Sequence, residues 1–203
     1  MSNNTKSAFT LAEVLITLVI IGVIAALTIP NIIYETKKRE YSSRLKKFYS
    51  NMKQAELRAR TDGKSWSDFV KTYYTQNSTD IGILFRDEYL LPYLSYVKLF
   101  ILAGYQPGVY LNDGSSFYIY KGYSCVTFYF DVNGNKKPNV SGKDIYEFQI
   151  CNTDLKFRPN HNYDFKINSR ELAFQYCKNY SEYCSALLYY DNWEYKDDYP
   201  YRL

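Results

Sequence analysis

The sequence has 203 residues, 46% of them hydrophobic and 23% charged, with a formal net charge of +4 at pH 7. This length suits one domain and still leaves a modest core if an apolar N-terminal arm is set aside. The charge lies next to that arm, because residues 35–64 carry ten basic and four acidic side chains, whereas residues 65–203 carry 14 and 16. A solvated helix face or contact with anionic lipid head groups explains this local excess better than a nucleic-acid site, so we expect no nucleic-acid partner.

An apolar run occupies residues 9–34, and a single acid, Glu13, interrupts it near its start. From residue 14 to residue 34 there are 21 residues without a charge. At about 1.5 Å rise per residue, they match a hydrocarbon core about 30 Å thick. The run is longer than that of a signal peptide, and the small residue Ala8 precedes it, so cleavage there leaves the apolar helix on the mature protein. Residues 9–34 are therefore predicted to cross a membrane.

The helix is predicted to continue past this run with a change of character. Gly22 and Pro30 each weaken an α-helix, glycine through backbone entropy and proline through its missing donor, so we expect bending or loosening between them. Residues 35–62 then predict an amphipathic helix, with Asp62 and Gly63 as its stop signal. Its apolar side chains recur at spacings of three and four: Tyr41, Leu45, Phe48, Met52, Ala55 and Ala59.

The rest of the chain combines helix and strand patterns. A further helix is predicted over residues 85–102, where apolar side chains recur on one face despite Pro92. Residues 108–151 contain short runs rich in Tyr, Phe, Val and Ile, separated by turn dipeptides such as Asp113-Gly114. This pattern predicts an antiparallel sheet. A short helix, RELAFQYC, is predicted after Ser169.

Four cysteines lie beyond the apolar run, and no two form a CxxC pair, which favours disulfides in an oxidising compartment over a zinc or redox site. A hairpin that pairs Asp131 with Ile145 also places two cysteines opposite each other, within reach of a disulfide. Four cysteines allow three pairings, and the one that we favour is Cys125 with Cys151 and Cys177 with Cys184.

The charges that flank the apolar run give the opposite topology. Lys37, Lys38 and Arg39 follow the run, whereas only Lys6 and the α-amine precede it. Taken alone, the positive-inside bias places the following domain in the cytoplasm. We give the cysteines more weight, and they place it outside.

One turn gathers oxygen ligands of the kind that calcium prefers: Asp131, Asn133, Asn135 and Asp144. The EF-hand pattern fails, however, because Lys136 stands at its glycine position and Gly142 at the position of its bidentate acid. A wide turn held by Asn and Asp side chains explains the same residues without an ion. Calcium is thus the one cofactor that the sequence raises, and we expect no other.

The sequence offers no motif for catalysis. His161 is the single histidine, and it lacks a Ser, Cys or metal-ligand pattern at a suitable spacing. The glycines form no phosphate-binding loop, so we expect no enzyme. The 24 tyrosines are expected to cover a small sheet and fill subunit contacts. An aromatic basic surface can bind single-stranded nucleic acid, but the tyrosine-rich tail is acidic.

The stretch AFTLAEVLITLVIIGVIAALTIP, residues 8–30, resembles the N-terminus of type IV pilins and of the pseudopilins of type II secretion. It combines a short polar leader, a small residue before Phe9, an acid at the fifth position after the cut, and a glycine and a proline where these helices loosen. The family usually has glycine where this chain has Ala8. The loop DVNGNKKPNVSGKD is also similar to turn-rich segments near the calcium loop of major pseudopilins.

The resemblance implies an α+β, pilin-like fold. Its long N-terminal helix, membrane-spanning in its first half and amphipathic in its second, would pack on a small antiparallel sheet with a disulfide-braced C-terminal region. Residues 35–203 would be the globular head. The resemblance also implies that prepilin peptidase removes residues 1–8, cutting between Ala8 and Phe9 on the cytoplasmic side, and methylates the new amine of Phe9. The head would then lie across the inner membrane, in agreement with the cysteines.

Glu13 needs a physical explanation, because an acid at the centre of a membrane helix costs about 2.5 to 3.5 kcal/mol and requires a partner. The amine of Phe9 in the same helix is one candidate, since the two residues are i and i+4 neighbours. The Phe9 amine of a subunit already placed in a filament is another, and that pair would fix the axial register. A Glu13 that merely lies at head-group depth would need no partner.

We therefore expect a structural subunit of a type IV pilus or type II secretion pseudopilus. Its partners would be prepilin peptidase, the inner membrane, copies of itself and other pilins in a periplasmic or cell-surface filament. The first alternative is a minor pilin whose head takes up DNA or adheres to a surface. The second is a membrane-anchored enzyme or sensor that carries the same motif.

Overall fold

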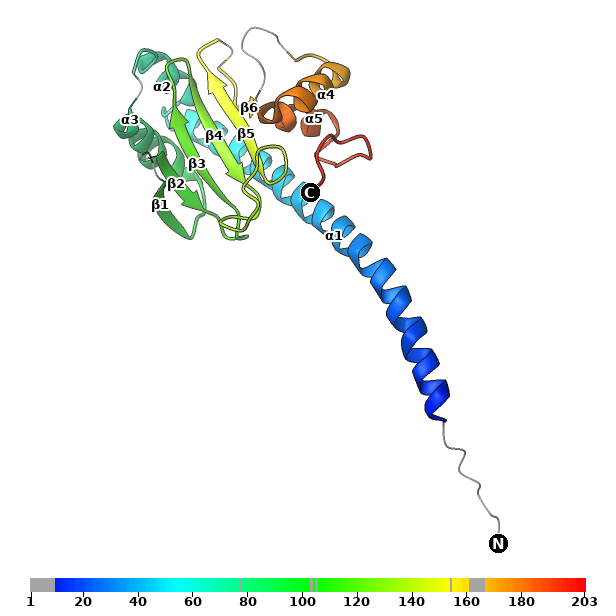
Figure 1. The fold of residues 1–203 in the computed structure, drawn as a ribbon. Coiled ribbons are helices and arrows are strands. Elements are labelled where there is room, and N and C mark those ends of the chain that lie inside the picture. Colours follow the sequence, from blue (N-terminus) through cyan, green and yellow to red (C-terminus); the bar gives the residue numbers. More distant parts are fainter. Residues whose placement is uncertain (1–9, 77, 103, 105, 154, 161–166) are drawn as a thin grey trace. The chain divides into compact units, whose positions relative to one another are not determined.

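The computed structural model describes residues 10–203 except 77, 103, 105, 154 and 161–166. The chain divides into two units, residues 1–37 and residues 38–203. Helix α1 (Leu11–Thr61) begins in the first unit and ends in the second, and the remaining elements belong to the second unit (Figure 1).

In the second unit, α1 buries one stripe of side chains. The buried residues are those that the spacing predicts, and each is at most 3% exposed: Tyr41, Leu45, Phe48, Met52, Ala55 and Ala59. The helix ends at Thr61, where the amide of Gly63 bonds the carbonyl of Arg60 and Gly63 takes a positive φ of 76°. Glycine adopts this conformation without the strain that a Cβ would add, so the predicted stop signal is confirmed.

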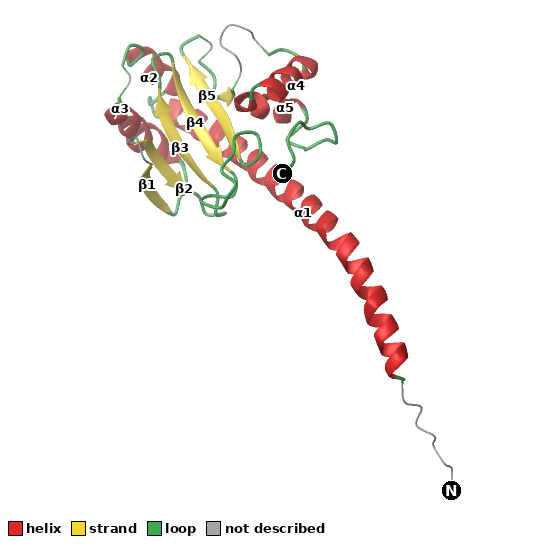
Figure 2. Ribbon diagram, viewed as in Figure 1, coloured by secondary structure: helices red, strands yellow, loops and turns green. Residues whose placement is uncertain are grey.

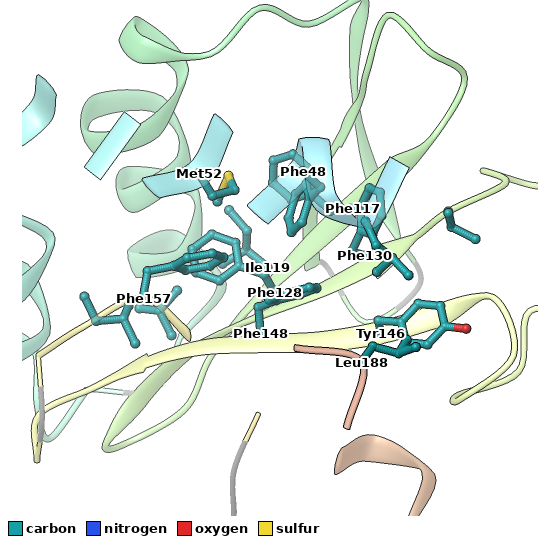
Figure 3. Packing of buried hydrophobic residues seen from close by; sticks show 14 of the residues in the cluster. Phe48, Met52, Phe117, Ile119, Phe128, Phe130, Tyr146, Phe148, Phe157 and Leu188 are labelled. Atoms are coloured by element: carbon teal, nitrogen blue, oxygen red, sulfur yellow. The ribbon is translucent and has the colours of Figure 1, made fainter. Parts of the chain in front are cut away.

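Phe48 lies at the centre of the contact between this stripe and the sheet (Figure 3). Its ring centroid lies 4.0 Å from that of Phe130 in a stacked pair, 5.2 Å from that of Phe148 and 5.5 Å from that of Phe117. Aromatic pairs at these separations contribute beyond the area they bury. One helical residue thereby joins three neighbouring strands.

The sheet is an antiparallel meander of six strands, and their order in space is their order in the chain (Figure 2). Side chains alternate between the two faces, so that Val126, Phe128 and Phe130 are buried in the core while Tyr129 lies on the other face. The strands are β1 (Lys98–Leu102), β2 (Gln106–Tyr110), β3 (Ser116–Lys121), β4 (Cys125–Asp131), β5 (Ile145–Cys151) and β6 (Arg158–Pro159).

The fold agrees with the predicted α+β class, but the sheet is wider than residues 108–151. It gains β1 at one edge and the two-residue β6 at the other. The Asp113-Gly114 turn forms as predicted, with Gly114 at a positive φ of 81° and the Asp113 carboxylate accepting the Ser115 amide at 3.2 Å.

The predicted helix over residues 85–102 is wrong beyond Tyr93. The helical part comprises α3 (Thr79–Leu84), the π-helical turn η1 (Phe85–Leu90) and the 3-10 turn η2 (Leu91–Tyr93). Pro92 lacks an amide donor, and Leu94 takes extended dihedrals, so the chain leaves the helix there. Residues 98–102 instead pair with β2, which satisfies their backbone groups on one side.

Helices from both ends of the second unit complete it. These are α2 (Trp66–Thr72), α4 (Arg170–Asn179), η3 (Ser181–Tyr183) and α5 (Cys184–Tyr190). The side chain of Ser169 accepts the Leu172 amide and caps α4, which therefore starts where the sequence indicated.

Two disulfides join the cysteines in the expected pairs. Cys125 and Cys151 lie opposite each other on β4 and β5, with their Cα atoms 4.1 Å apart. Cys177 and Cys184 close the connection between α4 and α5, with a Cα separation of 4.4 Å. The first disulfide follows from the hairpin register alone, because the same register pairs Asp131 with Ile145.

Replacing Phe48 tests the contact between α1 and the sheet. We expect Phe48→Ala to lower the free energy of unfolding of the second unit by about 3 to 5 kcal/mol, since it empties a site surrounded by three rings. Guanidinium titration of the full chain in detergent, followed by the fluorescence of the buried Trp66 and Trp193, measures this. Leu57, on the same helix, is 55% exposed, and Leu57→Ala should change the free energy by no more than about 0.5 kcal/mol. Equal effects of the two variants would contradict the packing described.

Candidate functional site

The start of α1 contains a reciprocal set of hydrogen bonds between Thr10 and Glu13. The backbone amide of Thr10 donates to Glu13 Oε2 at 2.9 Å, and the Thr10 hydroxyl donates to the same oxygen at 2.8 Å. In return, the backbone amide of Glu13 donates to Thr10 Oγ1 at 3.3 Å. Two side chains thus bond each other's backbone across the first turn.

This arrangement is a capping box, in which the residue before the helix and the third helical residue satisfy each other's amides. The first amides of a helix have no partner inside it, and a negative charge there also interacts favourably with the helix dipole. The letters TLAE at residues 10–13 carry the T-x-x-E spacing of this motif. The two hypotheses from the sequence, a charge in need of a cation and an acid at head-group depth, both missed the role of Glu13 as a cap.

The other residues of the predicted processing site, Ala8 and Phe9, lie outside the described residues. The pairing of Glu13 with a Phe9 amine therefore stays a prediction. Within the described part of the chain, Thr10 is the residue that bonds the Glu13 carboxylate, and it does so through Oε2. A carboxylate has about four lone-pair positions, so Oε1 remains able to accept from a further donor.

The apolar segment that follows has the composition of a membrane-spanning helix, and its hydroxyl groups are hydrogen-bonded within the helix. Helix α1 is the one described helix that is long and apolar enough to span a membrane by length and composition. Its large apolar side chains up to Ile33 are exposed in the isolated chain. The hydroxyls of Thr17 and Thr28 donate to the carbonyls of Val14 and Ile24, so the segment satisfies its own hydroxyl donors.

Gly22 and Pro30 both lie within the uninterrupted α1. The helix of the isolated chain is continuous through both residues, so the loosening predicted between them does not take the form of a break. A Cβ placed on Gly22 would meet no atom of the chain within 4 Å, so packing inside this chain does not require glycine there.

The β4–β5 loop brings together three of the four predicted calcium ligands. Asp144 is fully buried, and its carboxylate accepts the Val140 amide at 2.6 Å, the Asn139 amide at 2.9 Å and Asn133 Nδ2 at 3.0 Å. Asp131 lies beside them and accepts the Asn133 amide at 3.1 Å. Asn135 is exposed and forms no hydrogen bond to these groups within the described residues.

These bonds fit the turn held by Asn and Asp side chains better than a ready calcium site. Three N–H donors point at the Asp144 carboxylate, where a cation would have to approach. Burial raises the pKa of Asp131 to about 7, and the nearby Asp144 adds to this shift. Within the described residues, no group of three or more His, Cys, Asp and Glu side chains could hold a metal ion. Calcium binding stays a prediction, and His161 lies outside the described residues.

Comparison with known proteins assigns the two parts of the chain separately. Residues 31–203 match a family described as a family of unknown function (DUF6613), and the chain belongs to that family. Residues 3–29 match the prokaryotic N-terminal methylation motif, the signature of type IV pilins and pseudopilins. No curated protein and no solved structure matches the chain. The motif supports a pilin-like substrate of prepilin peptidase, and together with the apolar first part of α1 it fits a membrane-anchored pilin.

Amide hydrogen exchange tests the capping box. We expect Thr10→Ala and Glu13→Ala to speed the exchange of the first-turn amides by about 2- to 30-fold, which corresponds to the roughly 0.5 to 2 kcal/mol lost with a helix cap. Glu13→Gln should keep most of the protection, because glutamine also fits the capping box. The full chain in detergent micelles is suitable for this measurement. Unchanged exchange in both alanine variants would show that the cap does not hold the helix end.

Proposed function

We propose that this protein is a structural subunit of a type IV pilus or type II secretion pseudopilus. Prepilin peptidase would cut it between Ala8 and Phe9 and methylate the amine of Phe9, and α1 would then pack in the core of a helical filament. The observation that carries the proposal is the methylation motif joined to an exposed apolar helix that has Glu13 in its first turn. In this proposal the chain is the substrate of an enzyme and catalyses no reaction.

The bonds to Thr10 explain how Glu13 can serve both the isolated helix and the filament. An acid in hydrocarbon is costly when it has no partner, and the two donors of Thr10 supply partial compensation before assembly. Both donors belong to a residue that stays on the mature chain, so cleavage after Ala8 leaves them in place. In a filament, the Phe9 amine of a neighbouring subunit would add a charged donor at the remaining oxygen and set the axial register.

The proposed topology places the second unit outside the cytoplasm. Both disulfides belong to this unit, and the four described cysteines are all paired. Disulfides persist in oxidising compartments and are rare in the cytosol. They support a head in the periplasm or at the cell surface, against the positive-inside bias of residues 37–39.

Intact-mass analysis of membrane and sheared-filament fractions tests the processing step. The expected mass is that of residues 9–203 with one added methyl group. Ala8→Gly, which restores the residue usual in the family, should give the same product, whereas Ala8→Leu should leave the chain uncut because its side chain is much larger. A full-length, unmodified chain in the wild-type sample would refute the proposal.

The charge of Glu13 is tested separately from its capping role by comparing two variants. We expect both Glu13→Gln and Glu13→Ala to insert in the membrane and yet enter filaments at less than about a tenth of the wild-type level, since each leaves the amine without its counter-charge. Thr10→Ala removes the cap alone and should still enter filaments. Normal incorporation of Glu13→Gln would remove charge pairing from the account and leave only capping.

A further inference from the structure

A cationic groove runs along one side of the second unit. It consists of two adjoining cavities, of about 590 and 410 Å³, whose linings share Lys53 and Lys156. Arg60 lies in the first cavity and Arg158 in the second. Among the described residues that line the groove, Glu56 is the one acid, and it is bonded to Lys53 at 3.2 Å.

Two cationic side chains of the groove have no ion-pair partner within the described part of the chain. Arg60 and Lys156 are exposed, and neither takes part in an ion pair or a side-chain hydrogen bond there. By contrast, Lys53 contacts both Glu56 and the carbonyl of Phe157. The groove therefore presents a positive charge that its own lining does not neutralise.

Apolar side chains border the same groove. Leu57 is 55% exposed in the first cavity, and Tyr189 and Tyr190 are 47% and 39% exposed in the second. The Tyr189 ring also lies 5.6 Å from that of Tyr49. Aromatic side chains next to cations are typical of protein interfaces, where they supply area and the charges supply orientation.

The complementary surface lies in the C-terminal turn of the same unit. Glu194 and Asp197 are exposed, and neither forms an ion pair within the described residues. Asp80 and Glu171 are also exposed, but they lie in the first turns of α3 and α4, where the helix dipole stabilises them. Glu194 and Asp197 have no such compensation within the described residues, whereas Asp198 in the same turn bonds Arg170 at 2.8 Å.

Ion pairs and hydrogen bonds to buried groups hold this turn in place. Asp191 is buried and bonds both Arg170 and Lys196 at 2.6 Å. The hydroxyl of Tyr195 donates to that of Tyr146 at 2.8 Å, and the hydroxyl of Tyr199 donates to the carbonyl of Gly142 at 2.7 Å. The acids are thus presented on a preorganised segment, which reduces the ordering cost of a contact.

We propose that the cationic groove of one subunit receives the acidic turn, Glu194 to Asp198, of a second copy of this chain. The inference rests on the proposed filament function and names a contact between heads. The two patches are different surfaces of one chain, so their contact is heterologous. Such contacts build open helical assemblies when the rotation does not close. The charges of Arg60 and Lys156 would meet those of Glu194 and Asp197.

Charge reversal with rescue tests this contact in cells that express the full chain with its assembly machinery. We expect Arg60→Glu/Lys156→Glu, and separately Glu194→Arg/Asp197→Lys, to reduce the subunit in sheared filaments by at least roughly tenfold, because like charges then face each other. The fourfold variant that combines them should return to within about threefold of wild type, since the attraction is restored with opposite signs. The control Lys136→Glu/Lys178→Glu, at exposed positions away from the groove, should assemble normally.

The remaining possible results separate failure of this contact from failure of the proposed function. Normal assembly of both reversed variants, or a fourfold variant no better than either, would overturn the inference while leaving the proposed function intact. The Arg60→Glu/Lys156→Glu variant is also purified in detergent and compared with wild type for binding to a fluorescent oligo(dT). If the reversed variants assemble normally but this variant binds the oligo(dT) less than wild type does, the groove is a nucleic-acid site and the inference is wrong. A wild-type chain that is cleaved and methylated but never leaves the membrane would contradict the proposed function and this contact with it. Intact mass of the membrane pool shows that each variant was inserted and processed.

Discussion

The contact between the second half of α1 and the inner face of the sheet is the interaction on which the second unit depends. Phe48 stacks on Phe130 and touches rings from two further strands, so the helix and the meander share one aromatic core. The six buried positions on α1 lie at spacings of three and four, and the residues between them are free to be polar or basic. The start of the same helix lies within the methylation motif, residues 3–29, whereas residues 31–203 match a separate family.

The first part of α1 obeys a different constraint, because its side chains have no core of their own. Its apolar residues are exposed in the isolated chain, and its polar groups are satisfied within the helix. Glu13 follows the same logic, since Thr10 supplies two donors to one oxygen and takes one amide in return. The charge of Glu13 within the apolar run is thereby a helix cap, and its second oxygen is able to accept from a further donor.

The sequence was informative where a single period governed a long segment, as in the stripe of α1, and where register followed from a short turn, as for Cys125 and Cys151. It failed over residues 85–102, because apolar residues every three or four positions also fit a helical turn, a break at Pro92 and an edge strand. The two-residue β6 has no pattern to detect. The cap at Thr10 could have been found from T-x-x-E, whereas the exposure of Asn135 depends on the loop path alone.

In the proposed filament, Glu13 meets the amine of Phe9 from a neighbouring subunit. Solid-state NMR of filaments assembled from two pools of subunits tests it directly, one pool carrying carboxyl-labelled ¹³C-glutamate and the other ¹⁵N-phenylalanine. We predict a dipolar contact between the Glu13 carboxyl carbon and the methylated amine nitrogen, at a separation of about 4 Å as expected for an ion pair. The methylated amine is distinct from backbone amides in its shift. Filaments without this contact in the mixed sample would contradict the account.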